Sequence, residues 1–154
     1  MHTDSSGGFS AVKFLLIFLA IMIIVAGGIT AAYFIVRQMH TAEAQAVARS
    51  ITEDIQSNNP KAAFDDFSAT LKGEDQNTAY STWYFWVSSF NDDSNKVTLN
   101  TDSESILYNE ASVLNVLSSN ETIRFTYKTS HNALVYFDVK KSEGKWVLND
   151  YAAL

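Results

Sequence analysis

Cysteine is absent from this chain of 154 residues, and histidine is nearly so. The absence of cysteine excludes disulfide bonds, thiol nucleophiles and cysteine-ligated zinc sites, although it does not fix the compartment. The three histidines are His2, His40 and His131, and none has a cysteine, histidine or aspartate at metal-ligand spacing. We therefore predict neither a metal site nor a catalytic histidine.

Basic residues and glycine are also scarce. The chain has 11 Lys and Arg against 17 Asp and Glu, a formal net charge of −6. Nucleic-acid binding needs a basic surface, so this balance argues against nucleic acid as a partner. The six glycines form no phosphate-binding loop. We predict no bound cofactor and no catalytic residue.

Charge is missing altogether from residues 14–36, FLLIFLAIMIIVAGGITAAYFIV, where Thr30 and Tyr33 carry the only polar side-chain groups. At ~1.5 Å per residue, a helix of this length spans ~34 Å, which is enough to cross a ~30 Å hydrocarbon core. A core helix of a small soluble domain would show a polar stripe, and this stretch shows none. We therefore predict a transmembrane helix over 14–36, in which Gly27 and Gly28 permit close helix contact or a bend.

The charges beside this helix set its orientation only weakly. Lys13 precedes it, and Arg37 and Arg49 follow it, so the positive-inside count is near a tie. A short tail with little charge is common in signal anchors. We predict that residues 1–13 form a cytoplasmic tail, and that the chain crosses the cytoplasmic membrane once, with its C-terminal domain outside.

Residues 37–58 continue the helical composition, being rich in Ala, Glu, Gln and Arg. An apolar stripe at spacings of three and four predicts a helical stalk. The stripe consists of Ala44, Val47, Ile51 and Ile55. Two interpretations remain open: the stripe packs on the protein's own domain, or it packs against a neighbouring subunit.

Two further helices are predicted after the stalk. Asn59 is a good N-cap and Pro60, the single proline, suits the first helical position, so we expect a helix over 60–72 that stops at Gly73. A third helix is expected over 75–89. Its aromatic side chains cover more than one face and include Tyr80, Trp83, Tyr84 and Trp86. They are interpreted as core, with a pocket wall or a protein interface as the alternative.

The pattern then changes to alternation with a period of two. We predict a loop or edge over 91–104, followed by strands over 111–117, 122–129, 133–141 and 145–151, with a hairpin turn at 142–144. Helices followed by an antiparallel meander indicate an α+β domain.

One acidic loop resembles a calcium-binding pattern. Asn91, Asp93, Asn95 and Asp102 occupy positions one, three, five and twelve of an EF-hand count. Position six is Lys96, where the sharp turn requires glycine, and the closing ligand is Asp instead of Glu. We therefore interpret the stretch as a solvated loop.

The N-terminal junction, Gly7-Gly8-Phe9-Ser10-Ala11-Val12-Lys13, resembles the leader of type IV pilins and pseudopilins. In that family a short leader ends in glycine, phenylalanine often follows, and an apolar helix comes next. The resemblance implies cleavage between Gly8 and Phe9 by a prepilin-type peptidase. The chain departs from the family at Lys13, where a glutamate is usual, and its leader lacks the usual Lys or Arg. We therefore expect cleavage without robust polymerisation.

A second resemblance covers residues 62–81, 121–128 and 134–151. Gly73-Glu74-Asp75, Ala79-Tyr80 and Gly144-Lys145-Trp146 are similar to features of small bacterial domains of the nuclear transport factor 2-like superfamily. The resemblance implies that residues 59–154 form one domain in which helices pack on a curved antiparallel sheet around a cone-shaped pocket.

Six aromatic residues are then candidates for an interface or pocket: Tyr80, Trp83, Tyr84, Trp86, Tyr136 and Trp146. Some relatives use a carboxylate base in an apolar pocket, a role that Asp138 beside Tyr136 would mimic. An exposed surface aspartate is the preferred interpretation.

These observations support two functional hypotheses. The first is a membrane-anchored cell-surface protein with a non-catalytic interaction domain, a minor pilin-like component or envelope assembly subunit. Its partners would be membrane lipid and proteins, or copies of itself packed through the N-terminal helix. The second is a membrane-anchored enzyme or small-molecule binder that uses the cone pocket. An enclosed cavity with a desolvated carboxylate would favour the second hypothesis, and a space filled by tryptophan would contradict it.

Overall fold

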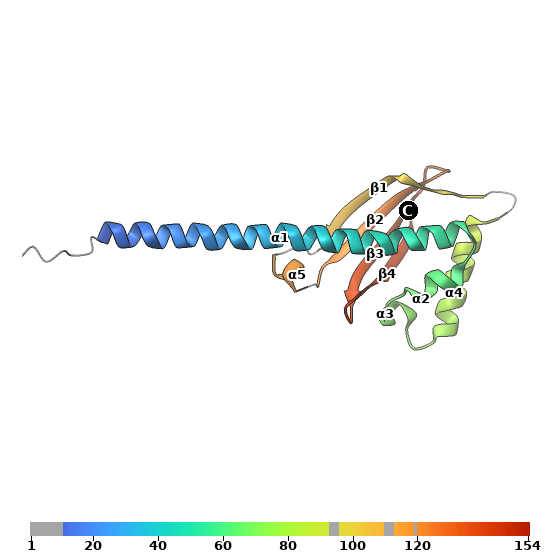
Figure 1. Ribbon diagram of the computed structural model, residues 1–154. Coiled ribbons are helices and arrows are strands. Elements are labelled where there is room, and N and C mark those ends of the chain that lie inside the picture. The colour runs from blue at the N-terminus through green and yellow to red at the C-terminus, as the bar shows by residue number, and fades with distance from the viewer. Residues whose placement is uncertain (1–10, 93–95, 110–112, 119) are drawn as a thin grey trace, which may run out of the picture.

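A single long helix carries the rest of the molecule. The computed structural model describes residues 11–92, 96–109, 113–118 and 120–154. Helix α1, Ala11–Gln56, runs for 46 residues without a break, as expected for a stretch that contains no proline. Its first part extends away from the domain and its last part lies across the sheet (Figure 1). The predicted membrane helix and stalk are thus one continuous element.

The sheet is a four-stranded antiparallel meander in the order β1-β2-β3-β4. Its strands are β1 Leu99–Asn109, β2 Thr122–Thr129, β3 Leu134–Ser142 and β4 Lys145–Ala153. The predicted hairpin turn is confirmed, because Ser142 pairs with Lys145 across Glu143 and Gly144. Both turn residues have positive φ, 51° and 82°, the combination that a type I′ hairpin turn requires. The predicted α+β class is confirmed.

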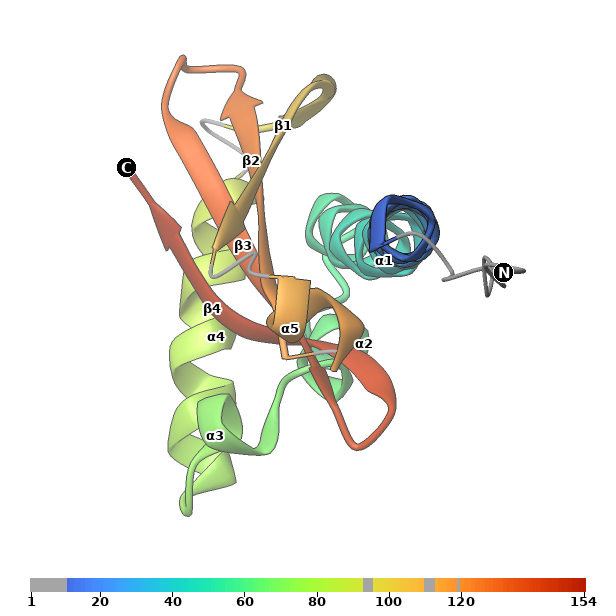
Figure 2. The ribbon, with the colours of Figure 1, turned by 90° about the vertical axis from the view of Figure 1, so that its left-hand side faces the viewer.

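Alternating side chains of β2 and β3 form the core. Ile123, Phe125 and Tyr127 are fully buried, as are Val135, Phe137 and Val139. The C-terminal half of α1 covers this face (Figures 1 and 2). Its contact positions are Ala44, Ala48, Ile51 and Ile55, all buried, with Val47 half-buried beside them. The stalk therefore packs on its own domain, the first of the two interpretations.

The predicted helix over 60–72 is wrong in its middle, where the chain leaves helical geometry. It forms α2, Pro60–Asp65, and α3, Ala69–Lys72. Between them Phe67 makes a parallel bridge with Leu148 of β4. Leu148 N donates to Asp66 O at 2.8 Å, and Ser68 N donates to Leu148 O at 2.7 Å. Hydrogen bonds to the sheet thus replace the helical ones. The predicted ends are correct: Asn59 caps α2, and α3 stops at Gly73.

The predicted strand over 111–117 is also wrong. Residues 113–117 form the short helix α5, Val113–Leu117, and residues 111 and 112 lie outside the described residues. The strand β1 lies earlier and includes part of the predicted loop or edge. It already pairs with β2 as far as Asn109 opposite Thr122, so residues 113–117 lie in the connection between two strands that are already paired.

Candidate functional site

The predicted aromatic residues of the third helix are mostly core. This helix is α4, Gln76–Phe90. The ring of Trp83 is fully buried and meets Phe67 at 4.9 Å and Tyr151 at 4.8 Å between centroids. Its Nε1 donates to Pro60 O at 2.8 Å. Trp86 stacks on Trp83 at 5.1 Å. These two indoles fill space between elements and do not line an enclosed pocket.

The other aromatic candidates are scattered over the molecule. Tyr80 is half-buried with its ring 5.2 Å from Phe64, whereas Tyr84 is exposed on the outward side of α4. Tyr136 and Trp146 lie in other parts of the sheet, on β3 and β4. The structure therefore brings Trp83 together with Trp86, and Tyr80 together with Tyr84, whose ring centroids lie 6.3 Å apart. It does not assemble the six residues into one site.

Asp138 and Tyr136 lie on the sheet face opposite the buried Val135 and Phe137. Both carboxylate oxygens of Asp138 accept hydrogen bonds from Arg124, each at 2.7 Å. The guanidinium of Arg124 lies 3.9 Å from the centroid of the Tyr136 ring. The hydrogen bond to Asp138 is the main reason that the pKa of Arg124 is raised. The bidentate pair fixes the orientation of this carboxylate. Asp138 is buried, with 7% exposure, so the predicted exposed surface aspartate is wrong: the pair with Arg124 compensates the carboxylate for its burial.

The calcium-like pattern is not assembled as a site in the described residues. The side-chain amide of Asn91 donates to Ile55 O at 2.7 Å and to Val87 O at 3.3 Å. Asp102 is exposed, and Asp93 and Asn95 lie outside the described residues. No group of three His, Cys, Asp or Glu in the described part of the chain could hold a metal ion.

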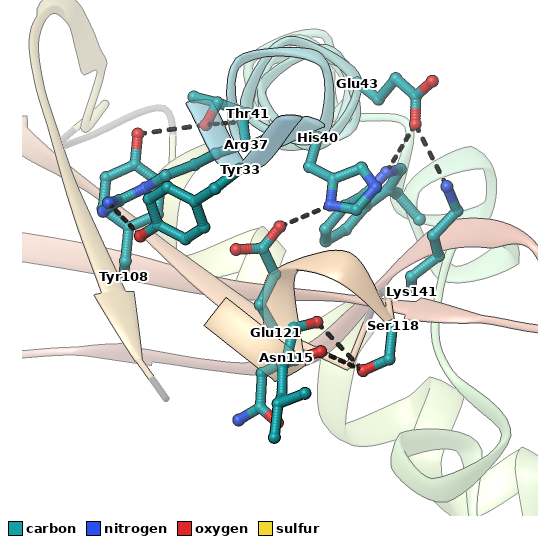
Figure 3. Close-up of polar contacts among 12 residues, drawn as sticks. Tyr33, Arg37, His40, Thr41, Glu43, Tyr108, Asn115, Ser118, Glu121 and Lys141 are labelled. Atoms are coloured by element: carbon teal, nitrogen blue, oxygen red, sulfur yellow. Dashed lines mark hydrogen bonds and ion pairs between the residues drawn. The ribbon is translucent and has the colours of Figure 1, made fainter. Parts of the chain in front are cut away.

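Sequence reasoning missed a buried pair between α1 and the segment that precedes β2. His40 Nδ1 lies 2.6 Å from Glu121 Oε1, and both side chains are buried (Figure 3). The second carboxylate oxygen, Oε2, is buried without a hydrogen-bond partner among the described residues. The imidazole also meets the Trp146 ring edge-on, at 5.4 Å between centroids. Burial of a carboxylate is costly unless it is compensated, so this contact depends on both partners being present.

A second contact fastens the same part of α1 to the last two strands. Trp146 Nε1 donates to Glu43 Oε2 at 2.8 Å. Lys141 Nζ lies 3.5 Å from the same oxygen (Figure 3). The hydrogen bond from Trp146 is the largest cause that lowers the pKa of Glu43, and Lys141 adds to it. Trp146 is therefore part of an anchoring contact and not of a pocket wall.

A third contact joins α1 to the end of β1. The Arg37 guanidinium lies 3.8 Å from the centroid of the Tyr108 ring and 5.6 Å from that of Tyr33. Arg37 Nη1 donates to the Tyr33 hydroxyl at 2.7 Å, and the hydroxyls of Thr41 and Tyr108 lie 3.1 Å apart (Figure 3). A groove of about 560 Å³ lies beside these residues and is open to solvent.

Farther along α1, Glu104 of β1 continues this contact. Its carboxylate accepts hydrogen bonds from Gln45, from Arg49 at 3.4 Å and from the Tyr127 hydroxyl at 2.7 Å. Burial, followed by the contact with Glu104, raises the pKa of Tyr127 well above its usual value. The hydroxyl therefore stays protonated and donates to Glu104. Polar contacts thus flank the apolar face of α1 over several turns.

Comparison with protein-family models, with curated proteins and with solved structures finds no match to this chain. The contacts themselves are therefore the basis for assigning a role. Four residues of α1 reach the sheet or the segment before it from two successive turns: Arg37, His40, Thr41 and Glu43. Tyr33, one turn earlier, accepts a hydrogen bond from Arg37. We call these residues and their partners the junction cluster. The geometry of this cluster can hold the domain in a fixed orientation relative to α1.

One sequence signal could have located this cluster. His40 lies four residues before Ala44 and so continues the buried stripe of α1 toward the N-terminus. Its partner Glu121 is 81 residues away, and no spacing rule connects the two. The stripe therefore predicts that His40 is buried, but it does not predict what His40 meets.

Proposed function

We propose that this protein is a single-pass membrane protein that presents a non-catalytic α+β interaction domain at the outer surface of the cytoplasmic membrane. One observation carries the proposal. Residues 11–32 of α1 are all exposed, whereas the same unbroken helix supplies core residues from Ala44 to Ile55. The described residues contain one helix that is long and apolar enough to cross a membrane. A bilayer would remove this apolar surface from water.

The junction cluster supports a rigid attachment of the domain to this helix. A flexible linker would contain Gly, Ser or Pro between the two parts, whereas the chain continues here as helix. The contacts of Arg37 with Tyr108 and of His40 with Glu121 begin within one turn of Val36. Such a domain cannot reorient freely, so a given face of it is always presented away from the membrane. This property suits a subunit that docks on partners or on copies of itself.

The enzyme or small-molecule binder stays a second candidate because of one observation, the fully buried carboxylate of Glu121. A buried carboxylate can act as a general base when a pocket brings substrate to it. Here the carboxylate packs against His40 of α1, and Trp83 and Trp86 occupy the space between α4 and the sheet. The interaction domain is therefore the better supported of the two.

Membrane insertion and orientation can be tested in one experiment, because the chain has no cysteine. Ser81→Cys places a thiol on an exposed position of α4. We expect the protein to stay in the membrane after carbonate extraction, and a membrane-impermeant maleimide to label it in intact cells. A chain that lacks residues 14–36 is the matched control, which should be released from the membrane. Labelling that requires lysis would contradict the outside orientation.

We further propose that this protein is a minor pilin-like component, which depends on processing between Gly8 and Phe9, two residues that lie outside the described part of the chain. We expect the protein isolated from membranes to begin at Phe9, as its mass and N-terminal sequencing would report. Gly8→Leu should block this processing and leave the rest of the chain unchanged. An intact Met1–Gly8 segment on the membrane-bound protein would exclude the pilin-like component and leave a plain signal anchor.

A further inference from the structure

Exposed leucines gather at the end of the domain that faces the apolar half of α1. Leu114 and Leu117 of α5 are 78% and 43% exposed, whereas Val116 of the same helix is fully buried. Seen from the apolar end of α1, α5 is the foremost labelled element of the domain (Figure 2). Figure 1 shows it beside α1, at the edge where the long helix leaves the domain. An apolar partner at such a place would remove this surface from water.

The position of α5 along the axis of α1, relative to the apolar segment, identifies that partner. The first side chains of α1 to lose exposure are Tyr33, Val36 and Arg37, followed by the buried His40. The domain therefore reaches back to the last turn of the apolar segment. His40 lies four residues beyond Val36, which is ~6 Å at ~1.5 Å per residue. A bilayer with a ~30 Å hydrocarbon core and a total thickness of ~40–45 Å has a headgroup layer of roughly 5–8 Å on each side.

The chemistry at this height is also that of a membrane interface. Tyr33 and Tyr108, both half-buried, have amphipathic rings of the kind enriched at headgroup level. The ionisable side chains there have partners: His40 contacts Glu121, and Glu43 contacts Lys141. Among the described residues Arg37 has aromatic partners and no carboxylate partner. Its cation is thus suited to a lipid phosphate.

We propose that α5 lies in the headgroup layer of the bilayer that α1 crosses, with Leu114 and Leu117 inserted toward the acyl chains. The domain then rests on the membrane at a second point and is not held above it on a stalk. This inference rests on the proposed membrane crossing of α1. An amphipathic segment that lies in the interface plane buries its apolar face ~5–10 Å into the boundary between headgroups and acyl chains.

Single nitroxide labels on the full-length chain test the inference, because the absence of cysteine leaves each introduced thiol unique. Leu117→Cys has a matched control in Leu134→Cys, since Leu134 is 41% exposed and lies in the register opposite Lys128, at the far end of the sheet. Leu114→Cys is compared with Phe85→Cys, an outward position of α4 that is 73% exposed. Ile24→Cys reports on the membrane segment.

The protein is reconstituted in vesicles of phosphatidylcholine with a third phosphatidylglycerol, and accessibility to oxygen and to a water-soluble nickel chelate is measured at each label. We expect the oxygen-to-nickel ratio at Leu114 and Leu117 to exceed that of their controls by about threefold or more. Ratios equal to those of Leu134 and Phe85, with Ile24 in lipid, would overturn the inference and leave the membrane crossing intact. A water-accessible Ile24 would overturn both.

Discussion

At the scale of single residues, the His40–Glu121 pair shows how much depends on giving a buried polar group a partner. Glu121 is fully buried, and one of its oxygens has no hydrogen-bond partner in the described part of the chain. Glu121→Ala should therefore destabilise the folded protein by about 1–3 kcal/mol, since it leaves the buried His40 ring without this hydrogen-bond partner. The double variant His40→Leu/Glu121→Leu should lose much less, because an apolar pair needs no compensation. Urea unfolding in detergent micelles, followed by tryptophan fluorescence, measures both. Equal losses in the single and double variants would contradict this account.

Asp66 is a residue at which charge opposes folding. It caps the C-terminal end of α2, where the helix dipole disfavours a carboxylate, and burial, followed by the charge of Asp65, raises its pKa. A raised carboxyl pKa means that the folded state binds the proton more tightly than the unfolded one. The stability that Asp66 contributes in its protonated form is then lost as the pH rises above the ordinary value of 3.8.

Asp66→Asn should thus stabilise the protein at pH 7 by about 0.3–1 kcal/mol, and the gain should vanish below pH 3.8, where both states are protonated. The matched control is Asp65→Asn at the neighbouring position. Asp65 is exposed and pairs with Lys61 at 2.6 Å, which lowers its pKa, so its removal should give no gain. The comparison is made by measuring the unfolding midpoint of both variants as a function of pH. A gain for both would indicate an effect of overall charge instead.

At the scale of elements, α1 sits close to the sheet because its contact positions are small. Ala48 is fully buried, opposite the inward side chains of β2 and β3. Ala48→Leu should overpack this contact and cost about 1–3 kcal/mol. Ala46→Leu lies on the exposed side of the same helix and should be neutral within about 0.5 kcal/mol. Thermal unfolding of the two variants in the same detergent makes the comparison. A neutral Ala48→Leu would mean that the helix is free to move off the sheet.

The break between α2 and α3 is a second property of this scale. Ser68 accepts a hydrogen bond from Leu71 N at 3.1 Å and so caps α3, while its own N–H is bonded to Leu148 O. Ser68→Ala should lose the cap and cost about 1 kcal/mol, without restoring a single helix over 60–72, because the bridge to β4 remains. Circular dichroism and urea unfolding report the two effects separately. A rise in helix content would contradict the role of the bridge.

At the scale of the whole molecule, α1 has two parts: its N-terminal part extends away from the domain, and its C-terminal part belongs to the domain core. A chain of residues 37–154 keeps the buried positions Ala44 to Ile55 and should fold as a water-soluble domain with a cooperative transition. A chain of residues 59–154 lacks that face of the core and should aggregate or unfold, since fully buried side chains of β2 and β3 would be uncovered. Size-exclusion chromatography and near-ultraviolet circular dichroism separate the outcomes. A folded 59–154 would show that α1 is only an accessory to the sheet.

The sequence by itself determined the features that depend on local periodicity. The uncharged stretch 14–36 and the absence of proline predict the long helix α1. The alternation of apolar and polar residues predicts β2 and β3, and the residues at 142–144 predict the hairpin turn. Each of these features depends only on residues that are close in the sequence, because a helix or strand repeats its buried face every few positions. The fold class follows from the same patterns.

Tertiary structure decided the features that depend on which segments meet. Residues 66–68 leave the helix because β4 offers hydrogen bonds there. Residues 113–117 form α5 because β1 and β2 are already paired up to the connection that contains them. The junction cluster joins residues 81 positions apart, as in His40 and Glu121. The physical reason is common to all three: a partner that is distant in the chain can change the free energy of a segment by more than the segment's own weak preference, and only the folded topology brings that partner near.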